Sequence, residues 1–308
     1  MLAVVNTPSG PEPVAIRDVP EPEPKPNEAL VAVHAFSLNR GELRLFQIRP
    51  EGWRPGQDIA GVVLRSAADG SGPSTGARVV GLCDWFGWAE RAAVPTGRLA
   101  VLPDTVSFTA AAALPVAGLT ALRTLRHGAP LLGKRVLVTG AAGGVGNLAV
   151  QLAVRSGARV TAIVGNPERA QILDGLGAAE IATRIEEVQG RFALILESAG
   201  GASLTAAIER IEAKGTIVVY GNSSGQSTDI DFRQFGEHQN ACIQAFHYFT
   251  CEPEERFGPD LELLVSLVAD GSLKPQIVEH DWRELPRVGP LLRDRKIPGK
   301  AVFRIPQP

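Results

Sequence analysis

The sequence predicts an α/β protein of two domains, a small β-barrel and a doubly wound parallel sheet. The chain has 308 residues, of which 44% are hydrophobic and 21% charged, so it exceeds the usual size of one domain. Its N-terminal third alternates short β-branched runs with Pro and Gly, which is typical of a barrel or sandwich. Beyond residue 108, apolar strands alternate with helical segments, which indicates a parallel sheet covered by helices.

The barrel strands are expected in the runs LAVVNT, VAIRDV, ALVAVHAF, DIAGVVL, ARVVGLC, WAERAAV and RLAVLP. A helical run, AAALPVAGLTALRTL, then leads to the strands VLVTG, VTAIV, FALILES and TIVVYG, with helices expected at 146–156 and through Arg169. In the C-terminal segment the sequence predicts a helix in LELLVSLVAD, an extended KPQIVEH, a helix near Leu291 and a last strand, AVFRI. The last of these elements are expected to return to the first domain. We therefore place the barrel domain at residues 1–115 and 276–308 and the parallel-sheet domain at residues 116–275.

The composition excludes several classes of partner. A formal net charge of -2 without a Lys/Arg cluster gives no electrostatic footprint for nucleic acid. No stretch reaches the ~18 apolar residues of a membrane span, and the N-terminus does not resemble a signal peptide. The three cysteines, Cys83, Cys242 and Cys251, fit neither a disulfide framework nor zinc-ligand spacing. We expect a soluble, cytoplasmic protein, with Cys83 unreactive.

The most informative segment is RVLVTGAAGGVGNLAVQLA, in which a strand runs into a glycine cluster and then into a helix. Its spacing is Ala141-x-Gly143-x-x-Gly146, so alanine occupies the first glycine position of a dinucleotide-binding turn and Gly140 is available to make the turn. Gly143 would let the backbone approach a pyrophosphate, Gly146 would let helix and strand pack closely, and the helix N-terminus would present N–H donors. The alternative is an ordinary strand-to-helix turn of small residues.

The choice of cofactor depends on the sequence about 20 residues beyond the glycines, where NAD sites usually offer an acid to the ribose. Here the chain reads VGNPER, and no acid ends the strand. Asn166 and Arg169 suit a 2′-phosphate better, although Glu168 opposes this and Arg169 is alternatively a solvated helix residue. Arg184 is a second candidate cation. We expect NADPH in preference to NADH.

Seven ordered motifs resemble the medium-chain dehydrogenase/reductase superfamily over nearly the whole chain: PGQDIAGVV, GWAERAAVP, AAALPVAGLTALRTL, VLVTGAAGGVG, ESAGG, VVYGNSSG and GKAVF. The chain is most similar to the zinc-free quinone oxidoreductase and enoyl reductase branch. This resemblance implies a GroES-like β-barrel domain, a Rossmann domain and a homodimer. Zinc-dependent members carry a cysteine and a His-Glu pair where this chain reads AFSLNRGEL and GQDIAGVV, so no zinc is expected.

Without a Lewis acid, a simple ketone would lack polarisation of its oxygen. The acceptor is therefore expected to be a small electrophile, a quinone or an α,β-unsaturated carbonyl compound, and the cofactor supplies the hydride. The sequence leaves two alternatives open. One is a non-catalytic dinucleotide-binding protein of the same fold, and the other is an enoyl reductase in lipid or polyketide assembly.

The resemblance also implies the site residues. At the reacting centre it places Asn39 and Arg40, and it implies no dedicated proton donor. Tyr248 and His247, in AFHYFT, are by their residue types either the source of a proton or packing residues. Along the cofactor the resemblance places Thr120, Gly143, Gly144, Val145, Asn166, Arg169, Arg184, Ser198, Gly200, Gly221, Asn222, Ser223 and Lys300. Trp53, Trp85 and Trp88 either line an acceptor pocket or cover the barrel ends, with Trp85 and Phe86 expected nearest the cleft.

Overall fold

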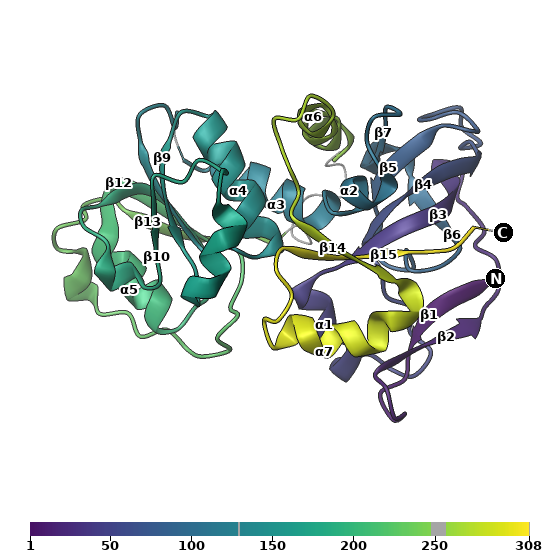
Figure 1. Cartoon of the computed structure of the whole chain (residues 1–308), viewed down its shortest axis with the longest axis horizontal. Helices are drawn as coiled ribbons and strands as arrows, with labels where there is room; N and C mark the ends of the chain where they lie inside the picture. Colours follow the sequence, from purple (N-terminus) through teal and green to yellow (C-terminus); the bar gives the residue numbers. More distant parts are fainter. Residues whose placement is uncertain (129, 248–256, 308) are drawn as a thin grey trace. The chain divides into compact units, whose positions relative to one another are not determined.

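The computed structural model describes residues 1–128, 130–247 and 257–307, which form two compact units (Figure 1). Unit 1 comprises Met1–Leu119 and Glu254–Pro308, and unit 2 comprises Thr120–Pro253. The division expected from the sequence differs from this one at residues 116–119 and 254–275. Much of the second difference is α6 (Gly258–Ala269), which belongs to unit 1 because it packs against the barrel strand β7 (Leu99–Val101).

Unit 1 is a mainly antiparallel, barrel-like sheet of seven strands in the order β14-β15-β3-β4-β5-β7, with β6 paired to β3. Its other strands are β3 (Glu28–Leu38), β4 (Asp58–Arg65), β5 (Arg78–Leu82), β6 (Arg91–Pro95), β14 (Ile277–Asp281) and β15 (Lys300–Arg304). A separate pair is formed by β1 (Leu2–Asn6) and β2 (Val14–Asp18). Because β15 pairs with β3, with Ala301 opposite Leu38, the C-terminal strand reaches the point where β3 ends.

The core of unit 1 follows from strand alternation. Along β3, Ala29, Val31 and Val33 are fully buried, and the residues between them are partly exposed. At the centre, the ring of Phe36 stacks on Trp88 and on Phe303, with both centroid distances 5.1 Å. Trp88 therefore belongs to the core.

Short helices close unit 1. The helix α1 (Arg40–Ile48) begins directly after β3 and packs on α7 (Leu285–Arg293), and α2 (Phe108–Ala112) packs on β3 and β4. Single 3-10 turns lie at η1 (Thr96–Arg98) and η6 (Trp282–Glu284). The helix α3 (Pro115–Leu125) runs from unit 1 into unit 2.

Unit 2 is a six-stranded sheet whose strands are all parallel, in the order β10-β9-β8-β11-β12-β13. The strands are β8 (Arg135–Thr139), β9 (Arg159–Ile163), β10 (Glu180–Ala182), β11 (Phe192–Glu197), β12 (Ile211–Val219) and β13 (Cys242–Ala245). Its helical elements are α4 (Gly144–Arg155), η2 (Pro167–Leu173), η3 (Ile185–Glu187), α5 (Ala202–Arg210) and η4 (Phe232–Phe235). This confirms the predicted doubly wound sheet.

The strand order reverses between β8 and β11, and such a switch point is where doubly wound sheets bind ligands. One predicted element differs. The segment through Arg169 forms the 3-10 helix η2 and not an α-helix. It ends at Leu173, because Gly175 and Gly177 follow with φ values of 73° and 87°, which a right-handed helix cannot continue.

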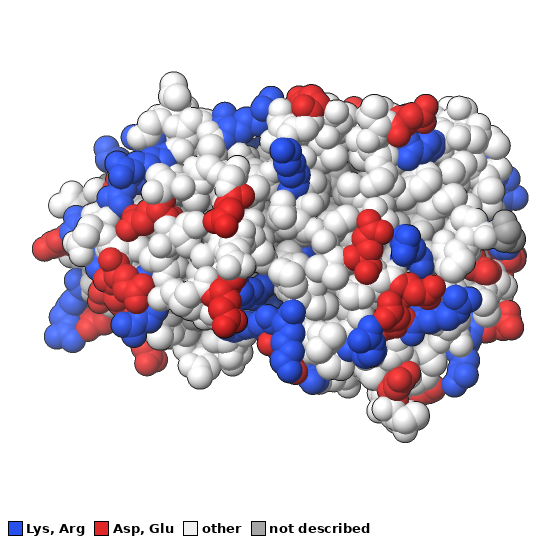
Figure 2. Space-filling model, in the orientation of Figure 1, with Lys and Arg blue, Asp and Glu red and all other residues white. Residues whose placement is uncertain are grey.

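The surface carries charges of both signs. Figure 2 shows that basic and acidic side chains are interspersed on the face in view, which is consistent with the small net charge. Among the residues described, no helix has both the length and the apolar composition needed to traverse a bilayer.

Candidate functional site

The glycine turn between β8 and α4 is shaped by two close approaches. Gly140 has a φ of 60°, a left-handed conformation that glycine adopts without strain. A Cβ at Gly146 would lie 2.3 Å from the carbonyl oxygen of Gly140, so no side chain fits there. At Gly143 a Cβ would lie 3.1 Å from the same oxygen, which is tight. The start of α4 is therefore pressed against the end of β8, as the sequence predicted for Gly146.

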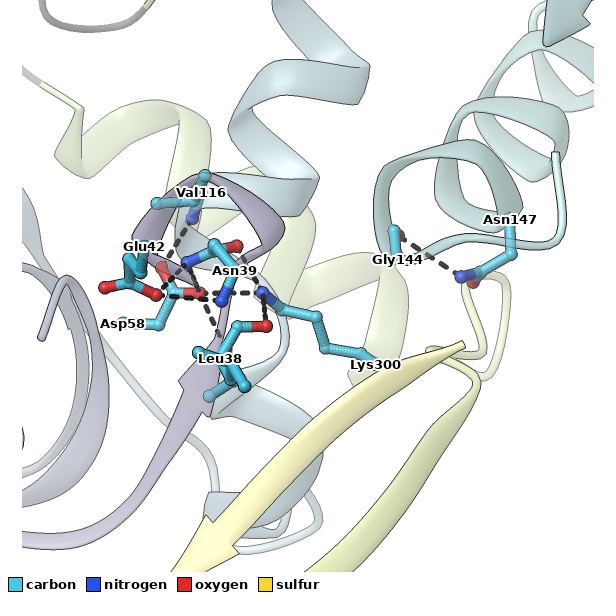
Figure 3. Close-up of polar contacts among 9 residues, drawn as sticks. Leu38, Asn39, Glu42, Asp58, Val116, Gly144, Asn147 and Lys300 are labelled. Carbon is cyan, nitrogen blue, oxygen red and sulfur yellow. Dashed lines mark hydrogen bonds and ion pairs between the residues drawn. The ribbon is translucent and has the colours of Figure 1, made fainter. Parts of the chain in front are cut away.

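The first turn of α4 is open to an anion. Gly143 is its N-cap and has no side chain to cap the helix, and Gly143, Gly144 and Val145 are partly exposed. Asn147 donates from Nδ2 to the carbonyl oxygens of Gly143 and Gly144, at 2.7 and 3.2 Å, and so stiffens this turn (Figure 3). A helix N-terminus of this form attracts a phosphate through its N–H groups and dipole.

A buried carboxylate, Glu197, ties the two strands of the switch point together. Its Oε1 accepts the backbone N–H groups of Ala199 and Gly200 at 2.8 and 3.0 Å, and its Oε2 accepts the Thr139 hydroxyl at 2.9 Å. Burial raises the pKa of Glu197, and these hydrogen bonds oppose the rise. Sequence reasoning missed this residue, although a single acid at the end of the apolar run FALILE was a signal.

The residues predicted at the ends of β11 and β12 do lie together. The backbone N–H of Ser223 donates to the Ser198 carbonyl at 2.9 Å. Gly200 has a φ of 71°, and a Cβ there would lie 2.3 Å from Oδ1 of Asn222. Gly221 is less confined, because its Cβ would lie 3.2 Å from the Ser198 carbonyl oxygen, which is tight. These segments form one edge beside the switch point.

The two candidate cations for a 2′-phosphate have different surroundings. Arg169 donates from Nη2 to the carbonyl oxygen of Ala142 at 3.3 Å, which brings its guanidinium to the glycine turn. Asn166 caps η2 by accepting the backbone N–H of Glu168 at 2.9 Å. Arg184 is exposed and pairs with Glu187 at 3.4 Å. The geometry thus favours Arg169 over Arg184.

Unit 1 contains a buried polar cluster around Asp58, at the start of β4 (Figure 3). Its Oδ1 accepts the backbone N–H of Val116 at 2.8 Å. Its Oδ2 accepts the Ser37 hydroxyl at 2.6 Å, Nδ2 of Asn39 at 2.9 Å and Nζ of Lys300 at 3.1 Å. Four donors, one of them an ammonium, compensate the loss of water around this carboxylate.

Lys300 and Asn39 are fixed by the same cluster. The Lys300 ammonium donates to the carbonyl oxygen of Leu38, to Oδ1 of Asn39 and to Asp58, so its three protons have three acceptors. Asn39 is thereby held at both ends of its amide. The sequence placed Lys300 along the cofactor and Asn39 near the nicotinamide; the structure brings the two side chains together within unit 1.

Glu42 lies beneath Asn39 and is 1% exposed. Its Oε2 accepts the backbone N–H and Nδ2 of Asn39 at 2.8 and 3.2 Å, and its Oε1 is buried with no hydrogen-bond partner among the described residues. Burial, reinforced by the charge of Asp58, raises the pKa of Glu42 to about 8. The side chain is therefore a neutral acid at pH 7. Its signal in the sequence was the helix-start pattern Asn39-x-x-Glu42.

Three predicted residues remain outside these clusters. Arg40 is exposed at the start of α1, and its Nη1 donates to the Leu292 carbonyl at 3.4 Å. Thr120 is buried in α3, where its carbonyl accepts the Thr124 hydroxyl at 2.7 Å. Tyr248 lies outside the described residues.

The Cys83 thiol is buried, and burial raises its pKa, which agrees with an unreactive cysteine.

No group of three or more His, Cys, Asp and Glu side chains that could hold a metal ion is found within residues 1–128, 130–247 and 257–307. In the two stretches where the sequence departs from zinc-dependent relatives, AFSLNRGEL and GQDIAGVV, the polar side chains include Asn39, Gln57 and Asp58, and there is no cysteine or histidine. Asp58 is already engaged by an ammonium, and zinc prefers thiolate and imidazole ligands.

Two protein-family models match the chain, one described as the alcohol dehydrogenase GroES-like domain at residues 25–104 and the other as zinc-binding dehydrogenase at residues 144–266. A chloroplast envelope quinone oxidoreductase homolog of Arabidopsis thaliana is 40% identical over 179 residues, which are 53% of this chain and 54% of that protein. The spectinabilin polyketide synthase system protein NorB of Streptomyces orinoci is 34% identical over 294 residues, 91% of this chain and 13% of that protein. The acrylyl-CoA reductase AcuI of Ruegeria pomeroyi is 38% identical over 141 residues, 43% of this chain and 42% of that protein.

The chain therefore spans about half the length of the curated quinone oxidoreductases that it matches. Among solved structures, the quinone oxidoreductase of Coxiella burnetii is similar with a TM-score of 0.85 and 25% identity, covering 99% of both chains. The quinone oxidoreductase of Escherichia coli in complex with NADPH has a TM-score of 0.86 and 22% identity, covering 99% of this chain and 100% of that one. At 22% identity, the similarity to the Escherichia coli protein shows the fold alone.

We predict that Lys300→Met lowers the free energy of unfolding by about 3–5 kcal/mol, because it leaves Asp58 buried and charged without its cation. Urea denaturation measures this loss. The matched control is Arg304→Gln on the same strand, whose exposed ion pair with Glu279 is worth at most about 1 kcal/mol. If the free energy of unfolding falls by the same small amount in both variants, the interpretation is wrong.

A second prediction concerns Glu42. Its folded pKa of about 8 lies above its ordinary value of 4.5, so between these values the folded protein holds a proton that the unfolded chain releases. The free energy of unfolding of the wild type, relative to Glu42→Gln, should therefore fall as pH rises from about 5 to 8, by up to about 1.4 kcal/mol per pH unit. The exposed Glu51→Gln serves as control. A difference between wild type and Glu42→Gln that does not vary with pH contradicts the prediction.

Proposed function

Because the chain belongs to the medium-chain dehydrogenase/reductase superfamily, whose zinc-free quinone oxidoreductase branch fits it, we propose that it is an oxidoreductase that uses NAD(P)H. It prefers NADPH and reduces a quinone or an α,β-unsaturated carbonyl compound without zinc. The observation that carries this proposal is the glycine turn at the switch point, where no side chain fits at Gly146 and α4 begins without a side-chain cap.

The residues present fit a dinucleotide. The N–H groups at Gly143, Gly144 and Val145 would hold the pyrophosphate, and the edge formed by Ser198–Gly200 and Gly221–Ser223 would flank it at the ends of the strands. When it is bound, the nicotinamide supplies the hydride. Everything else that the chain contributes is binding, orientation and the exclusion of water.

The preference for NADPH rests on Arg169. Its guanidinium donates to the carbonyl of Ala142, and Asn166 caps η2 at the start of the same segment. The strand β9 ends without an acid that would repel a phosphate. The Escherichia coli protein was solved with NADPH, which makes the same cofactor the first to test with this chain.

The acceptor class follows from the absence of a Lewis acid in the proposed mechanism. In a quinone or an enone the hydride reaches a conjugated position, and the charge that develops spreads over the acceptor itself. The Asp58 cluster then has a positioning role, because Lys300 and Asp58 hold the amide of Asn39 in one orientation.

A second candidate is the reduction of an enoyl thioester. The match to NorB extends over 91% of this chain, and AcuI is an acrylyl-CoA reductase. In an enone and in an enoyl thioester alike the hydride reaches the β-carbon, and only the group attached to the carbonyl differs. Turnover of crotonyl-CoA against that of simple quinones and enones separates the two.

The function is tested by NADPH oxidation, followed by absorbance, with a panel of quinones, enones and enoyl thioesters. We expect cofactor consumption that depends on the acceptor and persists after treatment with a zinc chelator. If the protein binds NADPH but consumes none with any acceptor, it is a dinucleotide-binding protein and the proposed activity is wrong.

Cofactor preference is tested by Arg169→Gln. The loss of a charge-assisted contact to the 2′-phosphate should weaken NADPH binding about tenfold or more and leave NADH binding nearly unchanged, as measured by fluorescence titration. Arg184→Gln, which removes a cation already paired with Glu187, is the matched control. If Arg184→Gln has the larger effect on NADPH, the assignment moves to Arg184.

A further inference from the structure

A cavity of about 420 Å³ lies at the amino-terminal edge of the parallel sheet in unit 2. It is lined by Arg135, Arg159, Ala179, Glu180 and Gln189. Three of these residues begin the neighbouring strands β8, β9 and β10. The strands are parallel and the glycine turn follows the other end of β8, so the cavity lies at the opposite edge of the sheet from the proposed dinucleotide site. We call it the arginine cavity.

The two arginines of this cavity occupy neighbouring positions. Arg135 lies opposite Arg159 in the register of β8 and β9, and adjacent strands are about 4.8 Å apart. Like charges at such positions repel each other. Among the described residues, neither guanidinium has a carboxylate at ion-pair distance, whereas Arg184, Arg191 and Arg233 of the same unit each have one. No ion pair within the described chain therefore offsets the repulsion between the two cations.

The side chain of Arg135 is held in place by the protein. Its Nη2 donates to the Gln189 carbonyl oxygen at 2.6 Å, and its guanidinium carbon lies 4.6 Å from the centre of the buried Phe192 ring. Gly190 has a φ of 79°, and a Cβ there would lie 2.0 Å from Nη1 of Arg135, so the glycine leaves room for the guanidinium. Among the described residues, the Gln189 carbonyl is the one hydrogen-bond acceptor of this side chain. Its other N–H groups remain available to a ligand in the cavity.

Arg159 completes the pair from the next strand. Its backbone N–H donates to the Lys134 carbonyl at 2.8 Å, which fixes the start of β9 beside β8. Its side chain is exposed and makes no hydrogen bond or ion pair within the described part of the chain. A phosphate group placed between Arg135 and Arg159 would give each guanidinium an oxygen acceptor, and its two negative charges would remove the repulsion between them.

The carboxylate in the same cavity determines which phosphate compound fits. Oε2 of Glu180 accepts the Thr161 hydroxyl at 3.2 Å, and Glu180 forms no ion pair with either arginine of the cavity, both of which are described. A carboxylate repels a bare anion, but it accepts a hydrogen bond from a hydroxyl group. The volume of the cavity lies within the range of about 300–1,000 Å³ that is usual for small-molecule sites. A ligand with a phosphate at one end and a hydroxyl at the other therefore matches both charges.

We infer that the arginine cavity is a second binding site, which takes a small phosphate ester that carries a hydroxyl group. Arg135 and Arg159 bind the phosphate, and Glu180 accepts a hydrogen bond from the hydroxyl group. Binding involves no covalent step. The inference does not depend on the proposed function, because the cavity and the glycine turn lie at opposite edges of the sheet.

Isothermal titration calorimetry of the full chain at low ionic strength tests the site with glycerol 3-phosphate, inorganic phosphate and glycerol. We expect glycerol 3-phosphate to bind more tightly than inorganic phosphate, and glycerol not to bind. Arg159→Gln should weaken the binding of both phosphates about tenfold or more, because a charge-assisted contact is lost. Arg159→Lys keeps the charge without the paired N–H groups and should recover part of the affinity.

Two further variants show where the phosphate lies. Arg233→Gln is the matched control, since it removes an exposed arginine of unit 2 that does not line the cavity, and it should bind both phosphates as the wild type does. Arg169→Gln probes the glycine turn as the competing phosphate site. If Arg169→Gln loses phosphate binding and Arg159→Gln keeps it, the phosphate lies at the turn and the inference is wrong.

Glu180→Gln tests the class of ligand. The neutral side chain no longer repels phosphate and accepts a hydroxyl less strongly than a carboxylate does. Inorganic phosphate should therefore bind more tightly to this variant, and the preference for glycerol 3-phosphate over inorganic phosphate should fall about threefold or more. An unchanged preference contradicts the role of Glu180 and, with it, the proposed ester.

Folding is checked by urea denaturation without ligand. Arg159→Gln should be at least as stable as the wild type, because it removes one of two like charges and no side-chain hydrogen bond within the described residues. Arg135→Gln would also lose the contacts with Gln189 and Phe192, so Arg159→Gln is the decisive variant. If Arg159→Gln is folded and binds both phosphates as tightly as the wild type, the arginine cavity is not a phosphate site and the inference is overturned.

Discussion

The contact between Gly146 and the carbonyl of Gly140 governs the proposed cofactor site. Because the space at position 146 is filled by that oxygen, α4 begins directly against the end of β8, and its first N–H groups point out at the switch point of the sheet. On the other side of the switch point, Glu197 binds Thr139 and so fixes β11 to β8 at the same edge. A rigid, anion-attracting edge follows from these two features.

Unit 1 depends on a different constraint, the buried ion pair of Asp58 and Lys300. These residues are 242 positions apart, and their contact joins the start of β4 to the start of the last strand. The same pair binds both ends of the Asn39 amide, because Lys300 donates to its oxygen and Asp58 accepts from its nitrogen. Glu42 also accepts from that nitrogen. Stability and the orientation of a predicted site residue therefore have one cause, and a variant in this cluster should be tested for both.

The sequence predicted those features that depend on neighbouring residues. Period-two runs gave the barrel strands, the βα alternation gave the doubly wound sheet, and the spacing around Gly143 gave the turn. It missed the roles of Asp58 and Glu197, because a buried carboxylate survives only through partners brought by distant strands. The lone acids at the start of DIAGVV and at the end of FALILE were the available hints.

Hydrogen–deuterium exchange with and without NADPH tests the central claim most directly. If the pyrophosphate lies on the first turn of α4, the amides of residues 143–146 should exchange more slowly when NADPH is bound, together with those around Arg169. Protection elsewhere in unit 2 with none at residues 143–146 would show that the dinucleotide is not held by this turn, and would contradict the account.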